Sequence, residues 1–478
     1  MTYAEAIQFL YGLRLFGAKF GLENTFQLAA LAGNPQDRLR FIHVAGTNGK
    51  GSTCAMLESI YRAAGLRVGL FTSPHLVSFR ERIQVNRRLI SEVDVVRLTE
   101  ELRKLGSEFR PAFRGTASGP AKAGTPNHDA SPTFFEFITV MALKFFAEQK
   151  CDLVIWETGL GGRLDATNIV TPLASVITNI ALDHQQWLGD TIGKIAAEKA
   201  GIIKPGVTVL TASDEPEALA VIERTARERN APLIKVEQAS RRFGAGETPA
   251  LPLLGDHQRL NAALALAAVQ ALQSEITVND LAVRTGLETV NWPGRLQLVE
   301  RPSGQKILLD GAHNVAGATA LRKTLSSWSS SFSLSGGTLK RELQPDGPEQ
   351  PLLGSFGAAG GGIPPKITLV LGVLEDKDWR QICETLAPLA TRIFTVPVAS
   401  ERTADAGELA AACHSVNPAA GVAADVSLRA ALEKSAPEEF VVVTGSLYLV
   451  GEALEILGLS PAGEGERALN EWTAPAMR

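Results

Sequence analysis

The chain has few cysteines, and their positions argue against two kinds of site. Only four of its 478 residues are cysteine, namely Cys54, Cys151, Cys383 and Cys413, and none of them forms a CxxC pair with another. This spacing argues against a disulfide scaffold and against a zinc knuckle. The cysteine usage fits a reducing compartment, so we expect a cytoplasmic location.

The sequence also lacks a long apolar run, a secretory leader and a surplus of basic residues. No stretch approaches 18 apolar residues, so no membrane span is predicted. The first 20 residues contain Glu5 and broken apolar runs, unlike a signal peptide. The formal net charge of −4 implies no large basic surface for nucleic acid or an anionic membrane. We expect a monomer whose partners are small molecules.

What the chain does contain is an alternation of short β-branched runs with segments rich in Ala, Leu and Glu. This alternation indicates βαβ units and a mostly parallel sheet. The expected strands in the first half are residues 40–44, 68–72, 153–156, 175–179 and 207–211, and the expected helices include residues 191–200, 216–228 and 258–272. The length favours two or three domains.

A second series of strands and helices begins after Trp292-Pro293-Gly294. Its expected strands are residues 306–310, 366–371, 392–396 and 439–443. We therefore predict an α/β fold with a P-loop N-terminal domain over residues 1–293 and a smaller, Rossmann-like domain over residues 294–478. Residues 110–131 and 326–365 are rich in Gly, Ser and Pro, which predicts solvated insertions or disordered loops.

Residues 41–52 read FIHVAGTNGKGS, an apolar run followed by a Gly-rich turn and a helix-like segment. In this setting backbone N–H groups surround nucleotide phosphates. Lys50 would reach the β and γ oxygens, and the Ser52 hydroxyl would bind Mg²⁺. The spacing departs from the standard P-loop, because position 44 is Val rather than Gly and position 51 is Gly rather than Ser or Thr. An ordinary βα turn is the alternative.

Other polar residues follow expected strands, where ligands of open α/β folds bind. Glu157 ends an apolar run beside a Gly-rich loop, which suits a Mg²⁺ ligand, although a strand-end acid in a turn is the alternative. Ser73 lies in a Ser-Pro turn, and His184 follows Asp183 after another strand. Arg82 could hold a carboxylate or phosphate, or belong to a solvated charge run.

In the second half, residues 310–314 read DGAHN at an expected strand-to-helix junction. Asp310 could face a nucleotide bound to the first domain, or it could serve as the N-cap of the next helix. Lys199 lies in a helical segment that reads AAEKAGIIK, where a solvated helix face is the ordinary interpretation.

Several segments together resemble the folylpolyglutamate synthases and the bifunctional dihydrofolate synthases, which are Mur-type ATP-dependent amide ligases. The matching segments are HVAGTNGKGS, LFTSPHLVSFRERIQVN, SPTFFEF, ETGLGGRLDATN, LDHQQWLG, IAAEKAGIIK, GDHQRLNA, WPGRLQ and DGAHN. They occur in this order from residue 43 to residue 314, with weaker likeness to about residue 451. Val315 departs from the family, which usually has Pro there, and so do the two Gly/Ser/Pro-rich segments.

The resemblance implies roles for individual residues. For ATP it implies contacts with Thr47, Asn48, Gly49, Lys50, Gly51, Ser52, Asn261, Arg295, Asp310 and His313. For two Mg²⁺ ions it implies Ser52, Ser73, Glu157 and His184 as ligands. For a pterin or folate pocket it implies Arg82, Thr133, Phe134, Phe135, Glu136, Leu164, Asp165 and Ala166. Lys50, Lys199 and His184 are the expected catalytic residues, and Lys199 matches the family's carbamylated lysine.

The implied activity is ATP-dependent ligation of L-glutamate to a folate or dihydropteroate carboxylate through an acyl phosphate. A Mur-type ligase for a peptidoglycan precursor is an alternative, but it would call for a further phosphate-binding segment near the N-terminus, which the sequence does not contain. A P-loop NTPase switch or binding module without ligase chemistry is a third possibility. It would turn over ATP without folate and glutamate.

Overall fold

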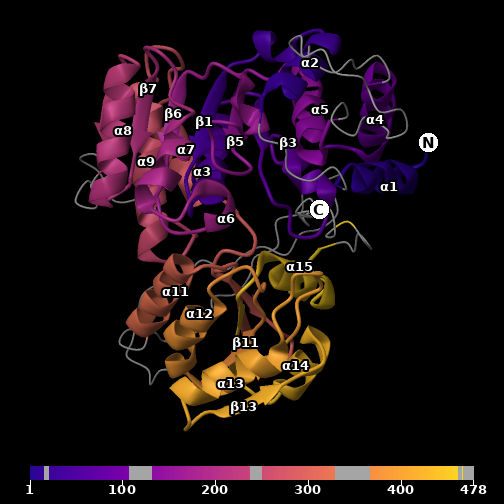
Figure 1. Ribbon diagram of the computed structural model, residues 1–478, viewed down its shortest axis with the longest axis vertical. Coiled ribbons are helices and arrows are strands. Elements are labelled where there is room, and N and C mark those ends of the chain that lie inside the picture. Colours follow the sequence, from indigo (N-terminus) through magenta and orange to yellow (C-terminus); the bar gives the residue numbers. More distant parts are fainter. Residues whose placement is uncertain (15–20, 107–131, 237–249, 329–365, 461–465, 467–478) are drawn as a thin grey trace, which may run out of the picture.

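The computed structural model describes residues 1–14, 21–106, 132–236, 250–328, 366–460 and 466. It has two lobes, each built around its own sheet, with the earlier part of the chain in one lobe and the later part in the other (Figure 1). The first segment predicted as an insertion, residues 110–131, lies outside the described residues. No helix within the described ranges is long and apolar enough to cross a membrane.

The sheet of the first lobe has eight strands in the order β4-β3-β2-β5-β1-β6-β7-β8. All its pairs are parallel except β2 with β3 and β3 with β4. The strands are β1 (Phe41–Ala45), β2 (Val68–Phe71), β3 (Ile83–Val85), β4 (Arg88–Leu89), β5 (Leu153–Glu157), β6 (Ala174–Ile177), β7 (Thr208–Thr211) and β8 (Leu233–Lys235). The mostly parallel sheet is therefore confirmed, and β3, β4 and β8 are additions to the expected strands.

Helices cover both faces of this sheet, so its central strands are buried along their whole length. They are α1 (Tyr3–Leu13), α2 (Glu23–Leu31), α3 (Lys50–Ala63), α4 (Glu92–Gly106), α5 (Phe134–Glu148), α6 (Gln185–Leu188), α7 (Ile192–Ala200), α8 (Pro216–Glu228), α9 (Asp256–Ala271) and α10 (Asp280–Glu288). Along β5, Leu153 and Ile155 face the core formed with α3 and α9, whereas Val154 and Trp156 face the core formed with α4 and α5. The alternation follows from the period of two in a strand.

The sheet of the second lobe has six strands in the order β13-β12-β11-β14-β10-β9, and only the pair of β9 with β10 is antiparallel. The strands are β9 (Gln297–Glu300), β10 (Lys306–Leu309), β11 (Ile367–Leu371), β12 (Ala390–Thr395), β13 (Gly421–Ala424) and β14 (Phe440–Thr444). The helices are α11 (Val315–Trp328), α12 (Trp379–Leu386), α13 (Ala406–Val416), α14 (Leu428–Lys434) and α15 (Leu447–Ile456). Short 3-10 turns span Pro35–Arg38, Phe79–Arg82, Ala166–Ile169 and Ala387–Leu389.

One predicted boundary is wrong. The second Gly/Ser/Pro-rich segment was expected from residue 326, but residues 326–328 form the last turn of α11, where Leu325 still packs into the core of the second lobe. The rest of that segment, residues 329–365, lies outside the described residues. The predicted domain boundary at residues 293 and 294 falls between α10 and β9, and it stays a prediction.

Candidate active site

The Gly-rich loop lies between the buried strand β1 and the first turn of α3. Its glycines allow a path that other residues would block. At Gly49 the backbone has φ of 89°, in the left-handed region, and an added Cβ would lie 2.5 Å from Asn261 Oδ1. At Gly46 an added Cβ would lie 1.7 Å from Thr178 Oγ1. The loop is therefore packed closely against its neighbours, and its residues line a cavity.

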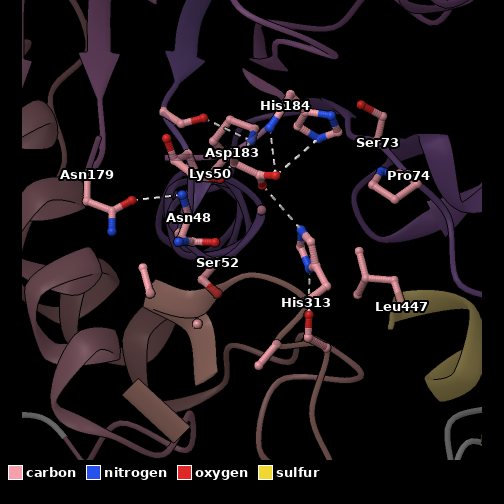
Figure 2. Close-up of a pocket in the computed structure, with 18 of the residues that line it drawn as sticks. Asn48, Lys50, Ser52, Ser73, Pro74, Asn179, Asp183, His184, His313 and Leu447 are labelled. Atoms are coloured by element: carbon pink, nitrogen blue, oxygen red, sulfur yellow. Dashed lines mark hydrogen bonds and ion pairs between the residues drawn. The ribbon is translucent and has the colours of Figure 1, made fainter. Parts of the chain in front are cut away.

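Hydrogen bonds to the loop after β6 hold this turn in place. The backbone N–H of Asn48 donates to Asn179 Oδ1 at 2.7 Å, and Thr178 Oγ1 donates to the Asn48 carbonyl at 2.7 Å. The contact between Asn48 and Asn179 is visible in Figure 2. Lys50 Nζ donates to the carbonyls of Gly46 and Thr47 at 3.0 and 3.2 Å. The ammonium group thus lies against the loop, at the position where a phosphate would bind.

A cavity of about 660 Å³ is lined by residues of both lobes. It collects most of the site residues expected from the sequence: Thr47, Asn48, Gly49, Lys50, Gly51, Ser52, Ser73, Arg82, Glu157, His184, Lys199, Asn261, Arg295, Asp310 and His313. The residues expected at the pterin pocket do not line it, apart from Arg82. Phosphate-binding, acidic and cationic groups therefore meet in one place although the chain brings them from distant segments.

Glu157 ends β5 inside this cavity, and only 3% of the residue is exposed. Its Oε2 accepts a hydrogen bond from the Ser73 backbone N–H at 3.0 Å. Burial raises the pKa of Glu157 to about 6, although Lys50 and the Ser73 amide oppose the shift. A carboxylate kept at this depth favours a positively charged ligand.

The oxygen donors of the site fit Mg²⁺, which prefers one or two carboxylates together with hydroxyls, waters and phosphates. Ser52, Ser73 and Glu157 supply such donors around the cavity. In the part of the chain that the structure describes, no three His, Cys, Asp or Glu side chains are grouped so as to hold a metal on their own. The donor set therefore suits an ion that arrives with nucleotide phosphates rather than a protein-only metal cage.

His184 lines the same cavity, and its ring contacts a lysine of the second lobe. Its Nε2 is 3.4 Å from Lys377 Nζ, and its backbone has φ of 49° at the start of α6. Burial lowers the pKa of the His184 imidazole to about 3, although the adjacent Asp183 opposes the shift. The ring is therefore neutral at pH 7 and faces an ammonium group in this arrangement.

Asp183 connects the lobes. Its Oδ1 accepts from Lys377 Nζ at 2.6 Å, and its Oδ2 accepts from Asn314 Nδ2 at 2.9 Å. Only 7% of each side chain of the ion pair is exposed. Burial alone would raise the pKa of the Asp183 carboxyl, but His184 and Lys377 beside it hold that pKa well below its usual value. Figure 2 shows Asp183 directed toward His184 and His313.

The Gly-rich loop itself also touches the second lobe. Asn48 and Asn314 exchange two amide hydrogen bonds between the lobes, at 3.2 Å and 3.0 Å. Sequence reasoning did not single out Asn314 or Lys377. The available signal was position, because Lys377 follows the end of β11 and Asn314 immediately precedes α11.

Lys199 is buried on α7, and its Nζ donates to the Gly46 carbonyl at 2.8 Å. Burial and the nearby Lys50 charge lower the pKa of Lys199 to about 7. A lysine on a solvated helix face would keep a pKa near its usual value. The structure therefore places this amine beside the phosphate-binding loop rather than on a solvated helix face.

The second lobe contributes two groups of opposite charge, the buried Asp310 and the half-buried Arg295. Asp310 follows β10, and its carboxylate accepts from the backbone N–H groups of Leu296 and Ala312 at 2.9 and 3.0 Å. Burial raises the pKa of Asp310, and it lowers the pKa of Arg295. Each of these two charges opposes the shift of the other. Asp310 therefore fixes the turn that carries Arg295 into the cavity.

Two other expected nucleotide contacts are held by neighbours in sequence. Asn261 Nδ2 donates to Gln258 Oε1 at 3.0 Å, one turn earlier on α9. His313 Nδ1 lies 2.8 Å from the Gly311 carbonyl, and its Nε2 lies 3.8 Å from Asp183 Oδ2. Both side chains face the cavity from positions that their local hydrogen bonds define.

The remaining expected pterin residues have structural partners. Thr133 and Glu136 form a capping box at the start of α5, with Thr133 N donating to Glu136 Oε2 at 2.7 Å. Phe134 and Phe135 pack in the core of the first lobe. Asp165 accepts from the Leu160 backbone N–H at 2.8 Å. Leu164 is half-buried and Ala166 is buried.

These residues nevertheless lie beneath the cavity wall. An added Cβ on Gly159, which lines the cavity, would come within 2.4 Å of the Phe135 ring. Asp165 holds Leu160, which also lines the cavity. Their role in substrate binding stays a prediction.

Comparison with known proteins gives a consistent group of relatives. The chain is 36% identical to the dihydrofolate synthase/folylpolyglutamate synthase of Bacillus subtilis, over 94% of this chain and 98% of the relative. It is 30% identical to the folylpolyglutamate synthase of Lacticaseibacillus casei, over 96% of this chain and 99% of the relative. No family model matches the chain.

Solved structures agree. A folylpolyglutamate synthase from Thermotoga maritima superposes with a TM-score of 0.75 at 31% identity, covering 97% of this chain and 98% of that one. An Escherichia coli FolC structure in complex with DHPP and ADP also gives a TM-score of 0.75, at 29% identity, covering 96% of this chain and 98% of that one.

Proposed function

The chain belongs to the family of folylpolyglutamate synthases and dihydrofolate synthases, and from this premise we propose that it joins L-glutamate to a folate or dihydropteroate carboxylate at the expense of ATP. The observation that carries the proposal is the shared cavity. It brings the Gly-rich loop and Glu157 of the first lobe together with Arg295 and His313 of the second.

The chemistry requires activation of a carboxylate, because its oxygen is a poor leaving group. The substrate carboxylate attacks the γ-phosphorus of ATP, and ADP leaves. The glutamate amine then attacks the carbonyl carbon of the acyl phosphate, loses a proton and expels phosphate. Closure of two lobes around the cavity would exclude water, which otherwise hydrolyses the acyl phosphate.

The protein's part in this reaction is positioning and charge neutralisation. The loop amides and Lys50 would hold the phosphates, and Arg295 would neutralise charge from the second lobe. Ser52, Ser73 and Glu157 would hold Mg²⁺, which supplies further neutralisation when bound. His184 would join them only if Lys377 moved from its 3.4 Å contact.

Lys199 is proposed to be carbamylated. A pKa of about 7 leaves about half of the amine neutral at pH 7, and only the neutral amine adds to CO₂. A carbamate would replace like charge beside Lys50 with opposite charge, and its oxygens would suit Mg²⁺. Lys199→Ala should lose most activity and regain part of it with a short carboxylic acid in the buffer. Carbon-13 NMR with labelled bicarbonate should show the carbamate.

A matched control is Lys194→Ala, which removes an exposed lysine of the same helix. It should leave the rate and the carbon-13 signal unchanged. A fully active Lys199→Ala enzyme, or an unmodified amine in the Mg²⁺-bound protein, would contradict the carbamate.

The test of the proposed function is ADP release with dihydropteroate or tetrahydrofolate, each with and without glutamate. The proposal expects turnover that needs both the pteroyl substrate and glutamate, with one glutamate added per ADP formed. Turnover of ATP without either would instead indicate an NTPase, and activity only with other amino acids or acceptors would indicate another Mur-type ligase.

A further inference from the structure

Glu466 lies against the first lobe although it follows α15 of the second lobe in sequence. Its Oε2 accepts from Ser78 Oγ at 2.9 Å and from the Phe79 backbone N–H at 2.6 Å. Only 7% of Glu466 is exposed. It thus supplies a carboxylate acceptor at the start of the 3-10 turn Phe79–Arg82, where backbone N–H groups lack partners within the turn.

His75 joins Glu466 to Arg82. Its Nε2 lies 2.9 Å from the Glu466 carbonyl oxygen, and its Nδ1 lies 2.8 Å from Arg82 Nε. A carbonyl only accepts and a guanidinium only donates, so a single tautomer satisfies both contacts. Nε2 carries the hydrogen and Nδ1 accepts from Arg82. The ring is 2% exposed, so water competes little for these bonds.

Arg82 is the member of this chain of contacts that reaches the cavity. Its guanidinium carbon lies 5.5 Å from the centre of the Phe134 ring, and the residue is 3% exposed. The guanidinium is planar, so holding Nε from His75 restricts the orientation of the whole group. Such a group binds a carboxylate or phosphate best when its plane is already set.

We infer that Glu466 and His75 are positioning residues, which hold Arg82 for a carboxylate or phosphate group of the substrate. The inference rests on the proposed function for the identity of that substrate. It makes a residue near the end of the chain part of the site in the first lobe. The competing explanation is that Glu466 only caps a turn and stabilises the fold.

The first experiment separates these explanations by kinetics. Glu466→Ala should raise KM for the pteroyl substrate about tenfold, as expected for a misplaced binding group, while KM for ATP changes less than twofold. Glu466→Gln keeps an acceptor oxygen and should recover most of the loss. Glu433→Ala removes an exposed glutamate of α14 and serves as the control.

A double-mutant cycle adds the connection to Arg82. Glu466→Ala should have little further effect on KM in an Arg82→Ala background, because the group that it positions is gone. If the effects of the two substitutions on KM multiply independently, or if Glu466→Ala lowers only thermal stability, the positioning role is wrong.

The second experiment does not depend on activity. Nitrogen-15 NMR of the imidazoles should show His75 as the neutral tautomer protonated at Nε2, with the signal assigned by its loss in His75→Asn. Glu466→Ala should shift this signal, whereas His414→Asn, at an exposed histidine, should not.

The two experiments together distinguish the two possible failures. An unchanged His75 signal in Glu466→Ala would overturn the inference even in an active ligase. The expected NMR shift in a protein without glutamate-dependent turnover would support the contact chain and reject the proposed function instead. His75→Phe should raise KM as Glu466→Ala does, and His75→Asn should be closer to the unmodified protein.

Discussion

Replacing Lys377 by methionine should destabilise the contact between the lobes. Methionine keeps much of the length of lysine but removes the ammonium group that lies 2.6 Å from Asp183 Oδ1. At an effective dielectric constant of about 20, two unit charges at that distance attract by roughly 6 kcal/mol before the cost of desolvation. Because the substitution leaves a buried carboxylate behind, we expect a net loss of about 3 kcal/mol.

The pH dependence of this loss follows from the pKa of Asp183. In the unmodified protein the pKa of Asp183 is depressed below its value of about 4 in the unfolded chain. The ionised carboxylate therefore adds fully to the free energy of unfolding above about pH 4, and this contribution is lost as the pH falls through the depressed pKa. In Lys377→Met, one of the positive charges that counteract the effect of burial is gone, so the pKa of Asp183 rises. The destabilisation should therefore be largest near pH 7 and smaller near pH 4.

The assay is urea unfolding without ligands at both pH values, followed by circular dichroism and tryptophan fluorescence. The unfolding curve can contain two transitions, because the two lobes need not unfold together. Asp183→Asn combined with Lys377→Met should recover most of the loss, because no charge is then left unpaired. A loss below about 0.5 kcal/mol, the same at both pH values, would refute the reasoning.

Three further predictions concern the loop and the long segment after α11. Lys50→Ala should lower kcat for ADP release by at least about a hundredfold with an unchanged circular dichroism spectrum, since its ammonium group contacts loop carbonyls rather than core groups; near-normal turnover would contradict its role. Gly46→Ala should abolish binding of an ATP analogue in calorimetry, because its Cβ would collide with Thr178, whereas Gly12→Ala, with nothing within 4 Å, should bind normally. Replacing residues 329–365 by a short linker should preserve ligase activity, as α11 ends at Trp328 and β11 begins at Ile367; inactivity of a folded variant would show that the segment serves the site.

The central strands and the phosphate-binding loop could be predicted from the sequence because their signals are local. A strand buried on both faces reads as a largely apolar run, as Phe41–Ala45 does with His43 as its one polar residue. The hairpin of β3 and β4 gave no such signal. Its turn has positive φ at Asn86 and Arg87, where Asn-Gly is the usual pair, so the arginine conceals the turn. The exposed, Ala-rich strand Gly421–Ala424 also lacks a strand-like pattern.

The contacts that assemble the site could not be predicted in the same way. Asp183 and Lys377 are 194 residues apart, and neither periodicity nor spacing reports a pair at that separation. Thr133 and Glu136 show the reverse case, in which a local signal was present but was not used. Their T-x-x-E spacing is a capping-box signature that the sequence displays openly, and the structure contains that capping box. The resemblance alone pointed to a pocket there.

The strand order has a consequence for synthesis of the chain. β1 lies between β5 and β6, so its last neighbour is complete only at Ile177. At about 5 to 20 residues per second, a ribosome needs roughly 7 to 26 s to travel from the end of β1 to that point. Throughout this interval at least one of the two strands that flank β1 has not been made, and an unpaired strand edge favours aggregation. Co-translational chaperone dependence should therefore be greatest before residue 177 and fall once the central strands can pair.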